Sequence, residues 1–180
     1  MPPAPRLLLA LLAAASLALP ACEQETSGGC PGKALATLAL HGVLDAAASG
    51  CAVPPTGGWN VPATLPDGTP DGTYQAVFSW DQGSQELAYC TGGPHSAVLR
   101  GTRDGDLVHA SVTIPGAVLG QCSTACTPLM TVTVDGVLDT GAVPVTFTGT
   151  LTEAFDDSPG SCGTCQLPCT SVYDLTGTGQ

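Results

Sequence analysis

Residues 143–155 alternate between apolar and polar side chains with a period of two, and this alternation constrains the fold most strongly. The apolar residues share one parity and the threonines the other: Val143, Val145, Phe147, Leu151 and Phe155 against Thr146, Thr148, Thr150 and Thr152. Successive side chains of a β-strand point to opposite faces, so this pattern indicates one buried and one exposed face. We predict a strand from Val143 to Phe155.

The same period recurs in two other segments. It covers residues 130–138, and it also places Tyr74, Ala76, Phe78 and Trp80 on one face of a second predicted strand. Residues 34–48 suit a helix or a strand by composition. Leu38–Asp45 (LALHGVLD) shares four of its eight residues with Val132–Asp139 (VTVDGVLD), so we predict a strand for both.

Turn residues separate the predicted strands. Asp104 and Gly105 lie between Val98–Arg103 and Leu107–Ile114, and this dipeptide is typical of a tight β-hairpin. The chain contains 23 Gly and 16 Pro, and only 11% of its residues are charged, which favours short strands over helices. The predicted fold is all-β, an antiparallel β-sandwich of about seven strands, with a small β-barrel as the alternative.

Nine cysteines give the chain an odd thiol count: Cys22, Cys30, Cys51, Cys90, Cys122, Cys126, Cys162, Cys165 and Cys169. Eight of them make up to four disulfides in an oxidising compartment, and one needs another role. The pairing is open on the sequence alone. We expect the loops at 120–127 and 160–170 to be joined to each other or to Cys90.

The N-terminus has the organisation of an export signal. Arg6 precedes an apolar run from Leu7 to Leu19, which is too short to span a bilayer as a helix. The run leads through Leu-Pro-Ala into Cys22, which resembles the lipobox of bacterial lipoproteins. That resemblance implies cleavage before Cys22, a diacylglycerol thioether on its sulfur and an acylated amino group, so that membrane lipid is a partner.

The resemblance also implies a domain organisation and a location. Residues 1–21 are then a signal peptide, 22–29 a lipidated flexible tether, and 30–180 a single disulfide-rich β domain. The protein belongs in the cell envelope, and Glu23 after the anchor favours the outer membrane where the cell has one.

Charge restricts the partners. Without residues 1–21 the chain has three Lys and Arg against fifteen Asp and Glu, a formal net charge of −12. Phosphate backbones are bound through Lys and Arg, so nucleic acid is excluded as a partner. The expected partner is a protein or a glycan of unknown identity.

Several residue groups have spacings that suit chemistry. Cys162 and Cys165 have the spacing of a thiol oxidoreductase, but no helix is predicted after them, so a structural disulfide is favoured. Together with Cys122 and Cys126 they also leave zinc as an alternative. Calcium is the alternative at three acidic pairs: Asp67 with Asp71, Asp104 with Asp106, and Asp156 with Asp157. No cofactor is expected.

No motif indicates catalysis. His41, His95 and His109 lack a neighbouring nucleophile motif, and His109 is predicted on the polar face of a strand. A Pro- and Gly-rich loop at 54–72 is the expected ligand loop, with Trp59, Asp67 and Asp71 as candidate contacts. We therefore expect a membrane-anchored binding or structural module, with a small enzyme or metal-binding protein that uses the cysteine-rich loops as the alternative.

Overall fold

Eight antiparallel strands make up the fold. The computed structural model describes residues 29–51, 72–91, 98–115, 126–156, 162 and 166–180. The strands are β1 (Lys33–Leu44), β2 (Gly72–Asp81), β3 (Glu86–Thr91), β4 (Val98–Asp104), β5 (Leu107–Ile114), β6 (Met130–Asp139), β7 (Thr146–Phe155) and β8 (Cys169–Gly179). These ranges contain no helix that is long and apolar enough to cross a membrane.

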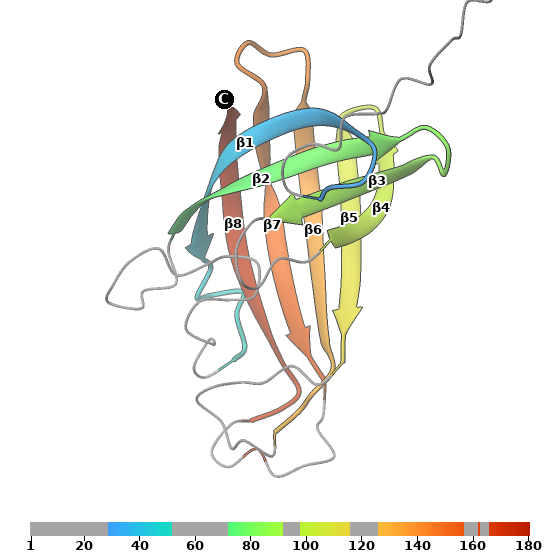
Figure 1. Cartoon of the computed structure of the whole chain (residues 1–180). Helices are drawn as coiled ribbons and strands as arrows, with labels where there is room; N and C mark the ends of the chain where they lie inside the picture. Colours follow the sequence, from blue (N-terminus) through green and yellow to red (C-terminus); the bar gives the residue numbers. More distant parts are fainter. Residues whose placement is uncertain (1–28, 52–71, 92–97, 116–125, 157–161, 163–165) are drawn as a thin grey trace, which may run out of the picture.

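The strands close into a barrel. Each strand pairs with the next along the chain, and β1 pairs with β8 to complete the wall. Leu40 of β1, for example, lies opposite Tyr74 of β2 and opposite Gly177 of β8. In Figure 1, β1, β2 and β3 cross in front of strands β5 to β8. The all-β antiparallel prediction is confirmed, the sandwich is wrong, and the alternative of a small barrel is correct.

The reason for this correction is the pairing of the first and last strands. A sandwich leaves edge strands, whereas β1 is hydrogen-bonded along both of its edges. The period of two is the same in both architectures, since each buries one face of every strand. Closure depends on the register between β1 and β8, which local sequence does not report.

The apolar parity of each strand fills the barrel. Phe78 packs against Tyr89 and Phe147 with ring centroids 5.0 Å apart in both pairs. The largest fully buried side chains also include Tyr173, Phe155, Leu38, Leu40, Leu87, Leu99, Met130, Leu138 and Leu151. The predicted polar parity faces outward, so the threonines of β7 lie on the outer wall.

Most of the predicted strands are confirmed. Residues 34–44 are a strand within β1, and the β4–β5 hairpin turns at Gly105, whose φ of 60° favours glycine. The strand predicted from Val143 begins only at Thr146, and Val143 is 98% exposed. Pro144 explains the later start, because it has no N–H for a sheet ladder.

The two ends of the barrel differ. We call them the turn end, where the connections are 82–85, 105–106 and 140–145, and the loop end, where they are 45–71, 92–97, 115–129 and 156–168. The C-terminus lies at the turn end, beside the turn between β6 and β7 (Figure 1). There the N–H of Gly179 donates to the carbonyl of Val145 over 2.7 Å.

Candidate functional site

Residues of strands β4, β5 and β6 line a shallow, open hollow on the outer wall of the barrel. The hollow has a volume of about 350 Å³. We call it the wall hollow, and its outward-facing lining residues are Thr102, Asp104, Leu107, His109, Asp135 and Val137. Three hydrogen-bonded strands hold these side chains, so their positions are set by the strand register and not by a loop.

The register arranges the lining in two rows. In the row nearer the turn end, Leu107 lies opposite Asp104 on one side and opposite Val137 on the other. Leu107 is 61% exposed and Val137 is 44% exposed. Large apolar side chains are more often buried, so two exposed ones opposite each other form a small apolar patch.

The second row is polar. His109 lies opposite Thr102 on β4 and opposite Asp135 on β6. His109 Nδ1 is 2.6 Å from Asp135 Oδ1, and both side chains are more than half exposed. This hydrogen bond fixes the orientation of both side chains next to the apolar patch. The prediction that His109 lies on a polar strand face is confirmed.

Arg103 comes from the same hairpin but faces the other way. Its Nε donates to the carbonyl of Gly105 over 2.6 Å, and its Nη2 donates to Thr140 Oγ1 over 3.1 Å. The guanidinium is also 3.6 Å from Asp106 Oδ1. Arg103 therefore stabilises the turn end of the barrel, and its charge does not neutralise the carboxylates in the wall hollow.

A second polar group lies inside the barrel, near the loop end. Tyr74 and Tyr89 share a hydrogen bond between their hydroxyls of 2.9 Å. Glu153 and Ser171 lie opposite each other on β7 and β8, and both are fully buried with Tyr173. The hydroxyls of Ser171 and Tyr173 have no hydrogen-bond partner in the described part of the chain.

Burial dominates the electrostatics of this interior group. It raises the pKa of Tyr74, Tyr89 and Tyr173 above the usual value for tyrosine. The negative charge of Glu153 raises the pKa of Tyr74 and Tyr173 further, whereas the hydrogen bond from Tyr89 lowers that of Tyr74. These side chains are buried, so the interior group bears on stability, whereas the wall hollow is open to solvent.

Six of the predicted disulfide cysteines pair in the described ranges. The bonds are Cys30–Cys90, Cys51–Cys169 and Cys126–Cys162. The last bond joins the two loops at 120–127 and 160–170, which confirms one of the two expected arrangements. Cys90 bonds to Cys30 instead of to these loops. Cys162 bonds to Cys126. Cys162 and Cys165, which have the spacing of a thiol oxidoreductase, therefore do not bond to each other.

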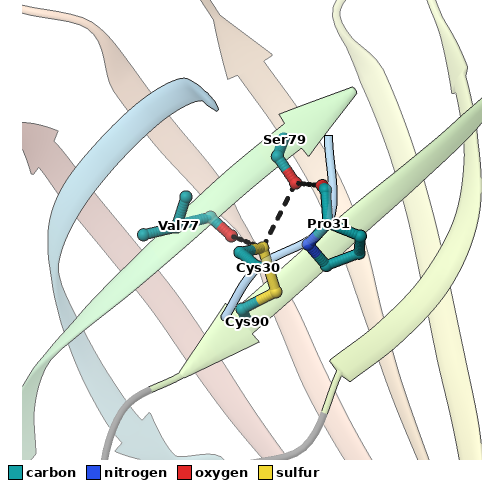
Figure 2. Close-up of a disulfide and its surroundings, with 5 residues drawn as sticks. All are labelled: Cys30, Pro31, Val77, Ser79 and Cys90. Atoms are coloured by element: carbon teal, nitrogen blue, oxygen red, sulfur yellow. Dashed lines mark hydrogen bonds between the residues drawn. A yellow bond between two sulfur atoms is a disulfide. The ribbon is translucent and has the colours of Figure 1, made fainter. Parts of the chain in front are cut away.

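The bond between Cys30 and Cys90 fastens the chain before β1 to the outside of β3. Figure 2 shows Cys30 and Pro31 lying over β2 and β3, with the Ser79 hydroxyl donating to the Pro31 carbonyl. The Cys30 sulfur is 3.2 Å from the Ser79 hydroxyl oxygen. This segment covers the outer wall there, and Ala88 and Cys90 are buried although they face outward.

Several predicted site residues lie outside the described residues. They are Cys22, Cys122, Cys165, Trp59, Asp67, Asp71, His95 and Asp157, together with the tether at 22–29 except Gly29. Asp104 ends β4 and lines the wall hollow, whereas Asp106 lies in the β4–β5 turn with its carboxylate 3.6 Å from the Arg103 guanidinium. Among the described residues, no group of three or more His, Cys, Asp or Glu is placed to hold a metal ion.

The chain matches no known protein-family model, no curated protein and no solved structure. The wall hollow is therefore the feature of the described residues that bears on function. Sequence reasoning placed His109 correctly but did not single out Asp135, its partner. One sequence signal could have pointed to Asp135. The similarity between Leu38–Asp45 and Val132–Asp139 aligns His41 with Asp135, and both side chains are exposed.

Proposed function

We propose that this protein is a lipid-anchored binding protein of the cell envelope, and that the wall hollow is its binding site. The observation that carries the proposal is the exposed pair Leu107 and Val137 beside the hydrogen-bonded pair His109 and Asp135. Binding sites combine an apolar surface with a few polar groups in fixed positions, and the wall hollow has both.

The size and support of the hollow agree with this role. Its volume of about 350 Å³ lies within the range of small ligand sites. β5 is hydrogen-bonded to β4 over one edge and to β6 over the other, so the site is formed before a ligand arrives. Pre-formed sites lose little conformational entropy on binding.

The cellular setting follows from the N-terminus and the cysteines. Cys22 is the proposed lipid attachment point, and the predicted tether at 22–29 connects it to the barrel. Disulfides persist in oxidising compartments outside the cytoplasm, and three lie in the described ranges. Lipidation on both sulfur and amino group gives a stable anchor, because each buried methylene contributes about 0.8 kcal/mol.

Site-specific photo-crosslinking in cells that make the full chain tests the binding role. A photoreactive amino acid replaces Leu107 in one variant, and Val43 of β1, which is 39% exposed, in the control. We expect a discrete crosslinked species from position 107 and none from position 43. Absence of any product at 107, or equal products at both positions, would contradict the wall hollow as the site. Intact mass of the detergent-extracted protein tests the anchor separately, through the acyl increment on Cys22.

A further inference from the structure

We propose that the wall hollow receives the side chain of a lysine or arginine from a basic segment of a protein partner. This inference rests on the proposed function, since it names the ligand class for the same site. Three observations carry it: an apolar strip, two carboxylates beside that strip, and the acidic charge of the whole chain.

The apolar strip fits the stem of a long basic side chain. Leu107 and Val137 lie directly opposite each other on neighbouring strands, so their side chains are adjacent. Lysine and arginine lay their methylene groups along apolar surface while the charged head stays in a polar environment. A ligand with a short polar side chain would leave this strip exposed to water.

Carboxylates lie on two sides of the strip. Asp104 is opposite Leu107 on β4, and Asp135 is two residues from Val137 on β6. His109 bonds Oδ1 of Asp135, which leaves the other oxygen of this exposed carboxylate to accept from a cation. Hydrogen bonds between charged partners are roughly twice as strong as those between neutral ones.

The charge of the whole molecule favours the same partner. The chain has 15 Asp and Glu against 4 Lys and Arg, a formal net charge of −11. Such a field increases the association rate of a basic partner and opposes an acidic one. Electrostatic attraction to the net negative charge does not by itself define a binding site. The test must therefore separate binding at the wall hollow from attraction to the rest of the acidic surface.

Asp174 supplies the matched control. It is exposed on the outer wall of β8, and Thr150 of β7 lies between it and Asp135 in the register. Asp135→Asn and Asp174→Asn therefore remove the same charge from the same wall, two strands apart. Only the first variant changes the wall hollow.

Fluorescence anisotropy with a labelled peptide of alternating leucine and arginine is the direct experiment, with the full chain in detergent. We expect Asp135→Asn to weaken binding about tenfold or more, since a charge-assisted hydrogen bond is lost, and Asp174→Asn to change it less than twofold. Leu107→Thr should also weaken binding, and the same peptide with glutamate in place of arginine should not bind.

Each other outcome is decisive. Equal losses in Asp135→Asn and Asp174→Asn would show general electrostatic attraction and overturn the inference. If position 107 crosslinks a partner in cells but the arginine peptide does not bind, the proposed function stands and the ligand class is wrong. The ligand would then be a glycan or a neutral protein surface. If neither assay responds, the proposed function itself fails.

Discussion

Two substitutions of the same kind inside the barrel should have different effects on stability: the first destabilises the protein and the second does not. Tyr89→Phe removes one hydroxyl of the 2.9 Å pair with Tyr74 and leaves the other buried without its partner. Loss of a buried hydrogen-bond partner costs about 1–3 kcal/mol. Tyr173→Phe removes a fully buried hydroxyl that has no hydrogen-bond partner in the described residues. Its removal should leave the free energy of unfolding unchanged or raise it by about 1 kcal/mol.

Urea unfolding with the disulfides intact measures both values by linear extrapolation. The double variant Tyr74→Phe, Tyr89→Phe is the control, because removal of both hydroxyls leaves no unpaired group and should recover part of the loss. If Tyr173→Phe destabilises the protein as much as Tyr89→Phe, the Tyr173 hydroxyl has a partner in solution and this account of the interior group is refuted.

Three further predictions concern the barrel. Above pH 10, the usual pKa of tyrosine, the unfolded chain releases protons that the buried tyrosines retain, so the free energy of unfolding should fall as pH rises. Urea titrations at pH 9 to 11 should show this fall, and Tyr173→Phe should make it less steep. Replacement of Cys51 and Cys169 by serine should cost about 2–5 kcal/mol, measured by thermal unfolding, because that bond closes a separation of 118 residues. Gly101→Ala should prevent folding or lower the melting temperature strongly, because a Cβ there would overlap the carbonyl oxygen of His109; a circular dichroism melt identical to wild type would contradict this.

Local signals in the sequence predicted most of the strands. Asp104 and Gly105 marked the β4–β5 hairpin, and the period of two marked β2, β6 and most of β7. β3 escaped prediction because all its residues from Leu87 to Thr91 are buried, which removes the alternation. Closure of the barrel was not predicted either, because β1 and β8, which pair to close it, lie at opposite ends of the domain sequence.

The wall hollow was only partly visible in the sequence. His109 could be placed on an outward face from its parity with Ser111 and Thr113. Its pairing with Asp135 depends on the register between β5 and β6, which are separated by residues 115–129. Candidate residues were therefore sought in loops, whereas the hollow lies on three strands whose partners only the fold brings together.

If Cys22 anchors the protein to a membrane as proposed, the disulfide between Cys30 and Cys90 has a mechanical consequence. A pull on the chain before residue 30 reaches the barrel through a covalent bond to β3, which is hydrogen-bonded to strands on both sides. Without this bond, the force would act on Lys33 and peel β1 from its neighbours one hydrogen bond at a time. Under the proposed anchoring, the disulfide would transfer a pull on the N-terminus to β3, so that β1 would not carry this force alone.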